Sequence, residues 1–70
     1  MTARELVRRA HEAGRTFSFP ASSNGPVIIT HGRAVIAVYP NGTIRHADKP
    51  LRAAPITATL AAHLLQIKEG

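Results

Sequence analysis

The side chains that could do chemistry in this chain are mostly cationic: nine lysines or arginines and four histidines, against four carboxylates. Arg4, Arg8, His11 and Arg15 follow the spacing i, i+4, i+7 and i+11, which places them along one face of a helix, with Arg15 just past its end. The planar fork of arginine can bond a phosphate with two hydrogen bonds, so this stripe predicts contact with phosphates. A solvated helix face, partly neutralised by Glu12 next to Arg8, is the alternative interpretation.

The histidines do not follow a metal-binding pattern. No two of them are four residues apart, as a helical zinc pair requires, and the chain has no cysteine, so we predict neither a metal site nor a cofactor. Acid–base catalysis needs two positioned groups. His31 with Arg33 and His46 with Arg45 are the pairs that could act on RNA, and solvated turn histidines are the alternative. We therefore expect binding without catalysis.

The net charge of +5 on 70 residues predicts an anionic partner, either RNA or DNA or the acidic surface of another protein. Charge that serves solubility alone is the alternative. The predicted nucleic-acid contacts include cations outside the first helix as well as those on it. The full set is Arg4, Arg8, His11, Arg15, Arg33, Arg45, Lys49 and Arg52.

These cations have to be positioned by a small sheet, whose strongest signal is the stretch 27–46. Residues 27–30, 33–39 and 43–46 are rich in β-branched side chains and predict three antiparallel strands. The turns between them fall at His31-Gly32 and at Pro40-Asn41-Gly42. In the second turn, Pro40 suits the second position and Gly42 the left-handed conformation, which gives a three-residue loop with a bulge.

A helix and one more strand are predicted ahead of this meander. Thr2 and Glu5 form a capping box for a helix over 2–13, and Gly14 suits its left-handed end. Residues 16–20 alternate as a strand, with Phe17 and Phe19 on one face. Core packing of the two rings is favoured, and a base-stacking platform is the alternative.

A second helix is predicted after a connector over 47–54, with Pro55 as its first residue. Large apolar side chains at helical spacing are expected to face the sheet. They are Ile56, Leu60, Leu64 and Ile67. The fold class is thus α+β: a helix, an antiparallel meander of three or four strands and a helix, with both helices on one face. We expect one domain over 1–70, without a membrane span, in the cytoplasm.

A helix, three antiparallel strands and a helix, with a basic first helix, resembles the double-stranded RNA-binding-domain fold. It is also similar to the small HicA-type toxins, which share that fold and cleave mRNA. The likeness runs from Glu5-Leu6-Val7 to Tyr39-Pro40-Asn41-Gly42, which resembles that family's Pro-Asp/Asn-Gly turn. The family places its catalytic histidine just after a Gly-Ser, whereas here His31 precedes Gly32-Arg33-Ala34. The resemblance therefore implies nucleic-acid binding more directly than cleavage.

Three functions follow from these patterns. The first is a small nucleic-acid-binding module, of phage or mobile-element type, that acts without catalysis. The second is a protein-interaction or inhibitor module that uses a homodimer or a sheet edge and exposes Ile56 or Leu65. The third is a ribonuclease like the HicA-type toxins.

Overall fold

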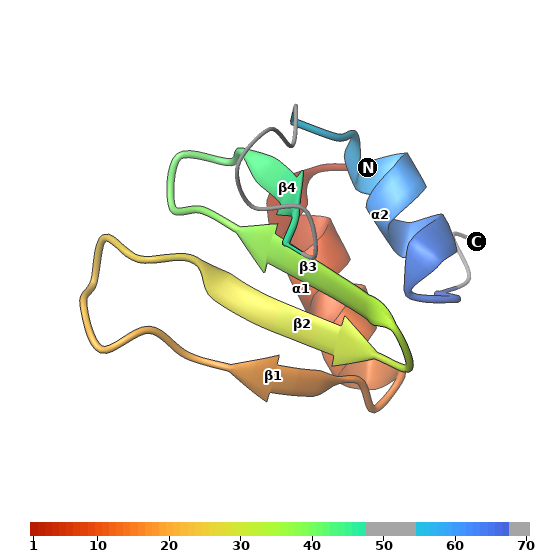
Figure 1. The fold of residues 1–70 in the computed structure, drawn as a ribbon. Helices are drawn as coiled ribbons and strands as arrows, with labels where there is room; N and C mark the ends of the chain where they lie inside the picture. The colour runs from red at the N-terminus through yellow and green to blue at the C-terminus, as the bar shows by residue number, and fades with distance from the viewer. Residues whose placement is uncertain (48–54, 68–70) are drawn as a thin grey trace.

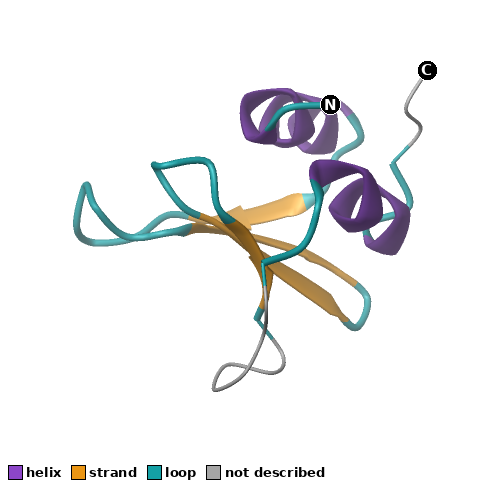
Figure 2. Ribbon diagram, turned by 90° about the horizontal axis from the view of Figure 1, so that it is seen from above, coloured by secondary structure: helices purple, strands orange, loops and turns teal. Residues whose placement is uncertain are grey.

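The computed structural model describes residues 1–47 and 55–67, which form a helix, a four-stranded sheet and a second helix. The elements are α1 (Ala3–Glu12), β1 (Thr16–Ser18), β2 (Val27–His31), β3 (Ala34–Val38), β4 (Ile44–His46) and α2 (Ala58–Leu64). The strands are antiparallel and lie in the order β1-β2-β3-β4 (Figure 1). Both helices lie on the same side of the sheet, as Figure 2 shows. The predicted α+β architecture is confirmed, in its four-stranded form.

The turn between β3 and β4 has the predicted bulged geometry. The amide of Gly42 donates to the carbonyl of Tyr39 at 3.0 Å, and the amide of Tyr39 donates to the carbonyl of Thr43 at 2.8 Å. Gly42 has a φ of +91°, the left-handed value that glycine adopts at little cost. The side chain of Asn41 accepts from the amide of Thr43 at 2.9 Å and closes the loop. This turn fixes the register that pairs Val38 with Ile44.

The turn between β2 and β3 lies one residue later than predicted. His31 pairs with Ala34 and belongs to β2, so the two turn residues are Gly32 and Arg33. Gly32 has a φ of +60°, whereas Arg33 has none of the positive values that require glycine. Glycine in the first turn position is typical of a type II′ turn. The shift occurs because glycine reaches positive φ far more readily than histidine does.

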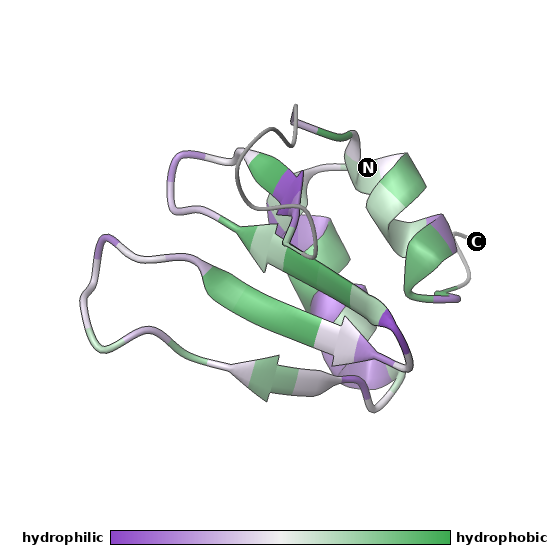
Figure 3. Ribbon diagram, in the orientation of Figure 1, coloured by the Kyte–Doolittle hydropathy of each residue, from purple (hydrophilic) through white to green (hydrophobic). Residues whose placement is uncertain are grey.

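The core lies between the helices and one face of the sheet. Along β3, Ile36 and Val38 face the helices, opposite Ile29 and Ile44 on the neighbouring strands. The apolar colour of β2 and β3 is plain in Figure 3. From the helices, the buried contributions are Leu6, Ala10, Ala58, Ala61, Ala62 and Leu65, followed by Ile67 after the end of α2. Alanines on α2 let its backbone come close to α1 and β4.

The second helix differs from its prediction in its start and in its buried face. It begins at Ala58, with Thr57 as the N-cap, rather than at Pro55. Its buried side is made of alanines and Leu65. Of the side chains predicted to face the sheet, Ile67 is buried and Ile56 and Leu64 pack against the core, whereas Leu60 is 45% exposed. The Thr57 hydroxyl accepts from the amide of Leu60 at 3.1 Å, and a side chain that caps in this way sets where the helix begins. Of the connector predicted over 47–54, residues 48–54 lie outside the described residues.

Candidate nucleic-acid interface

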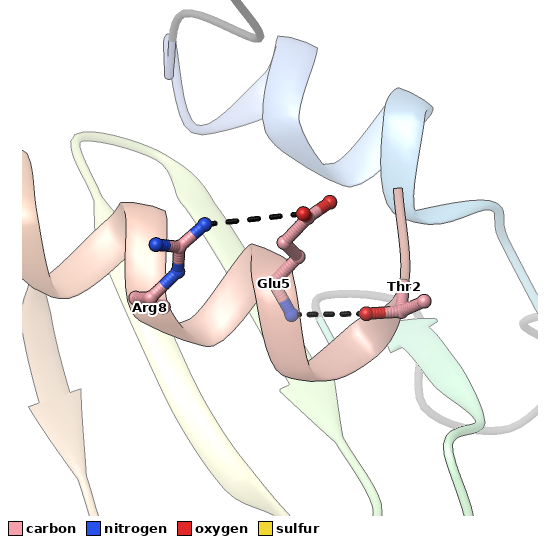
Figure 4. Close-up of polar contacts among 3 residues, drawn as sticks. All are labelled: Thr2, Glu5 and Arg8. Atoms are coloured by element: carbon pink, nitrogen blue, oxygen red, sulfur yellow. Dashed lines mark hydrogen bonds and ion pairs between the residues drawn. The ribbon is translucent and has the colours of Figure 1, made fainter.

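The N-terminal half of α1 positions the first two arginines of the predicted stripe. The hydroxyl of Thr2 accepts from the amide of Glu5 at 3.1 Å, so the predicted N-cap is present. The carboxylate of Glu5 turns toward Arg8, and its Oε1 lies 3.8 Å from Nη2 of Arg8 (Figure 4). Arg8 was expected to pair with Glu12, but it forms an ion pair with Glu5, one turn toward the N-terminus. The two side chains are 61% and 41% exposed, so water screens this pair and Arg8 keeps access to another anion.

Arg4, Arg8 and His11 are all exposed, and they line two neighbouring hollows along one flank of α1. The first hollow, of about 490 Å³, lies between Arg4 and the turn that contains Asn41 and Gly42. The second, of about 460 Å³, takes its polar lining from Arg8, His11 and Glu12. Val7 lines both hollows, so they adjoin at the middle of the helix. The α1 flank, by which we mean Arg4, Val7, Arg8 and His11, is therefore open surface with cationic side chains along it.

The apolar wall of the second hollow is aromatic. Phe17 is half-buried and packs on the core, as predicted, but Phe19 is 75% exposed. Because β1 ends at Ser18, Phe19 extends beyond the strand, and the prediction that both rings fill the core is wrong for this one. The rings of Phe17 and Phe19 are nearly parallel, with an interplanar angle of 15° and centroids 6.1 Å apart. The ring centroid of His11 lies 6.1 Å from that of Phe17, and the two rings are tilted by 57°.

Arg15 continues the predicted stripe in sequence, but its guanidinium makes hydrogen bonds within the protein. Its Nε donates to the carbonyl of Leu65 at 2.8 Å, and its Nη2 donates to the carbonyl of Gln66 at 3.0 Å. Its Nη1 donates to the carbonyl of Ala13 at 3.0 Å. All three nitrogens of the guanidinium thus bond backbone at the ends of the two helices. Periodicity put Arg15 on the same stripe as Arg4, Arg8 and His11, but hydrogen bonds to the carbonyls of Leu65 and Gln66 leave it poorly placed to bind a phosphate.

The other predicted cations are spread over the molecule. Arg33 is exposed in the turn at the far end of the sheet from Asn41 and Gly42, and it lines neither hollow of the α1 flank. Arg45 pairs with Ala37 and, by strand alternation, belongs to the face of the sheet away from the helices. Lys49 and Arg52 lie outside the described residues. The structure thus gathers Arg4, Arg8 and His11.

The two histidines considered for RNA cleavage lie in the strands. His31 is half-buried at the end of β2, and its Nε2 lies 3.3 Å from Oε1 of Gln66. His46 is half-buried in β4, opposite Ile36. Within residues 1–47 and 55–67, no three histidine or carboxylate side chains gather as metal ligands could. No helix in that part of the chain is long and apolar enough to cross a membrane.

Comparison of this chain with protein-family models, with curated proteins and with solved structures found no match. The geometry of the α1 flank and its aromatic wall is therefore the basis for a functional proposal.

Proposed function

We propose that this chain is a small nucleic-acid-binding module that acts without catalysis and holds phosphates along the α1 flank. The observation that carries the proposal is that Arg4, Arg8 and His11 are exposed together beside two adjoining hollows. The net charge of +5 supports it, since a basic protein attracts a polyanion over a distance. A chain without cysteine also fits the expected reducing, cytoplasmic setting.

The length of the flank suits a short run of nucleotides. Arg4 and His11 are seven residues apart, which at about 1.5 Å per residue is about 10 Å along the helix axis. That distance matches about three nucleotides of a fully stacked strand, at the axial rise of about 3.4 Å per nucleotide that one strand has in a duplex. Arg4 and Arg8 would each contact one phosphate, and His11 would lie beside the next. A partner with a single acidic side chain would engage only part of this flank.

The direct test reverses the charge on the flank. The double variant Arg4→Glu, Arg8→Glu is expected to weaken binding to a short oligonucleotide by tenfold or more, equivalent to about 1.4 kcal/mol. Both side chains are exposed, so the free energy of unfolding should change by less than about 1 kcal/mol. Fluorescence anisotropy with a labelled strand measures the first quantity, and urea unfolding measures the second.

A matched control separates the flank from net charge. Arg8→Glu and Arg33→Glu change the charge of the chain equally, but only the first lies on the proposed surface. We expect Arg8→Glu to weaken binding several times more than Arg33→Glu. Equal losses would show that the net charge alone attracts the strand. Unchanged binding in the folded double variant would overturn the proposal.

Salt dependence gives an independent test of phosphate contact. Two phosphates neutralised by Arg4 and Arg8 on a single strand predict a slope of about −1.4 in log K against log salt, at about 0.7 for each phosphate. A flat titration would contradict the proposal. The same samples test the expectation of no catalysis: labelled RNA should stay intact. Cleavage that is lost in His31→Ala or His46→Ala would favour the ribonuclease instead.

A protein-interaction module is the second candidate, and the exposed Leu60 favours it. The prediction that Leu65 is exposed is wrong, because Leu65 is fully buried, and Ile56 is half-buried. Leu60 is instead the large apolar side chain that α2 presents to solvent. If α2 mediates a homodimer, sedimentation should show a dimer that Leu60→Glu converts to a monomer. A monomer at high concentration would remove this candidate.

A further inference from the structure

The exposed ring of Phe19 is the least expected feature of the α1 flank. Among the described residues, the large apolar side chains exposed to solvent are Met1, Phe19 and Leu60, and Phe19 is the most exposed of them. Its ring is nearly parallel to that of Phe17, which is anchored on the core. Phe17 and Phe19 are two residues apart in an extended segment, so their rings lie on the same side of the chain. They form an aromatic wall whose outer member has a face open to solvent.

The groups beside this wall are suited to a flat ligand with a negative charge attached. Arg8 and His11 line the same hollow as the two rings, and Arg4 lines the hollow next to it. Glu12 also lines the aromatic hollow, so the positive charge lies toward the Arg4 end of the flank. An unpaired nucleobase has an aromatic face, and the phosphates on either side of it carry the charge that arginine binds.

We propose that Phe19, supported by Phe17, stacks an unpaired base of single-stranded nucleic acid whose neighbouring phosphates lie against Arg4 and Arg8. This inference rests on the proposed function and specifies its ligand. In a duplex, each base is covered above and below by its neighbours, so the ring of Phe19 has no free base to cover. A single strand exposes its base faces, and aromatic side chains in a basic groove are the usual way of binding it.

The test compares three single strands of equal charge with one another and with a duplex, which carries twice as many phosphates as each of them. The probes are a decamer of deoxythymidine, the ribouridine decamer, an abasic decamer of the same length, and a blunt duplex of ten base pairs. Wild-type protein is expected to bind at least one of the two single strands at least tenfold more tightly than the abasic decamer and the duplex. The two decamers then show whether the DNA or the RNA strand is preferred. Equal binding of the abasic decamer would overturn the inference and leave phosphate binding standing.

Variants of Phe19 separate stacking from apolar contact. Phe19→Ala and Phe19→Leu are both expected to weaken binding of the preferred decamer by about tenfold, because neither offers an aromatic face. Phe19→Trp should restore it, and since the chain has no tryptophan, the new fluorescence should be quenched when the strand binds. Leu60→Ala, which shortens an exposed apolar side chain on α2, should leave binding unchanged. If Phe19→Leu binds as wild type, the ring makes only an apolar contact and stacking is refuted.

The outcomes of the two proposals remain distinguishable. If Arg4→Glu with Arg8→Glu weakens binding while Phe19→Ala does not, the proposed function stands and the stacking inference fails. If no nucleic acid binds, both fail. If Phe19→Ala instead converts a dimer to a monomer in sedimentation and leaves strand binding unchanged, the ring covers a second copy of the chain and stacking is refuted.

Discussion

The two helices begin and end with the same local motifs, but different forces hold their C-terminal ends. Each has a threonine N-cap, Thr2 in α1 and Thr57 in α2. Each ends in a pair of backbone hydrogen bonds of the Schellman type, followed by a residue in the left-handed region. In α1 that residue is Gly14, with a φ of +76°, whereas in α2 it is Gln66, with a φ of +55°.

Gly14 needs no help from the rest of the molecule, because glycine adopts positive φ without steric cost. Gln66 is a residue with a Cβ, and the left-handed region costs such residues about 1–2 kcal/mol. Tertiary contacts offset this cost: Arg15 donates to the carbonyls of Leu65 and Gln66, and the side chain of Gln66 lies against His31. The end of α1 is thus determined locally, and the end of α2 by distant residues. An isolated helix of seven residues would not be stable.

The largest change in the free energy of unfolding is expected from replacing Arg15, whose hydrogen bonds join the C-terminal ends of α1 and α2. Arg15→Ala should lower the free energy of unfolding by about 2 kcal/mol, because hydrogen bonds from a charged donor contribute about 1.5–3 kcal/mol. Arg15→Lys keeps the charge beside both helix ends but loses the forked geometry, so it should fall between Arg15→Ala and wild type.

Urea unfolding measures these changes, and Arg33→Ala is the control. Arg33 is an exposed arginine in a turn, and its removal should change stability by less than about 0.5 kcal/mol. If Arg15→Ala were as mild as Arg33→Ala, the end of α2 would not depend on tertiary contacts. The contrast between the helices would then disappear.

The next largest effect is expected at the end of α1. Gly14→Ala should destabilise the fold by about 1 kcal/mol through backbone conformation alone, since a Cβ at Gly14 would meet no atom within 4 Å. Gly14→Asn should cost less, because asparagine tolerates the left-handed region better than alanine. Thermal unfolding of the two variants measures the difference. Equal losses would indicate that a steric contact, rather than the positive φ, explains the need for glycine.

The same contrast explains which parts of the fold could be predicted from sequence. The bounds of α1 were predicted within a residue at each end, because Thr2 and Gly14 act through hydrogen bonds that lie within a few residues of them. The bulged turn at Pro40-Asn41-Gly42 was predicted for the same reason. The start of α2 was missed, and its buried face was predicted only in part: Ile67 is buried and Leu64 packs against the core, but Leu60 is exposed. Large apolar side chains suggested that face, whereas close packing on α1 and β4 also buries the alanines.

In the candidate site, too, features set by neighbouring residues could be predicted and features set by distant residues could not. Helical periodicity identified Arg4, Arg8 and His11, which are exposed along one flank of α1. It could not show that the guanidinium of Arg15 is bonded to carbonyls 50 residues away, since those carbonyls are brought near only by packing of the helices. Nor could alternation show that β1 ends at Ser18 and leaves Phe19 in solvent.

The smallest change in the free energy of unfolding is expected at Gln66, and it is an increase, whereas substitutions of Arg15 and Gly14 lower it. Gln66→Gly removes the cost of about 1–2 kcal/mol that a residue with a Cβ has in the left-handed region. The greater freedom of glycine stabilises the unfolded chain and offsets about 0.4–1 kcal/mol of this gain. The carbonyl of residue 66 still accepts from Arg15, so the principal tertiary contact is kept. The exposed contact with His31, at 3.3 Å, is lost, and it contributes little because water competes for both groups. We therefore expect a gain of about 0.5 kcal/mol in the free energy of unfolding, whereas Gly14→Ala gives a loss at the equivalent position of α1.

His31→Ala, measured by urea unfolding together with Gln66→Gly, isolates the side-chain contact. A loss in Gln66→Gly that His31→Ala reproduces would show that this contact, and not Arg15, holds the end of α2.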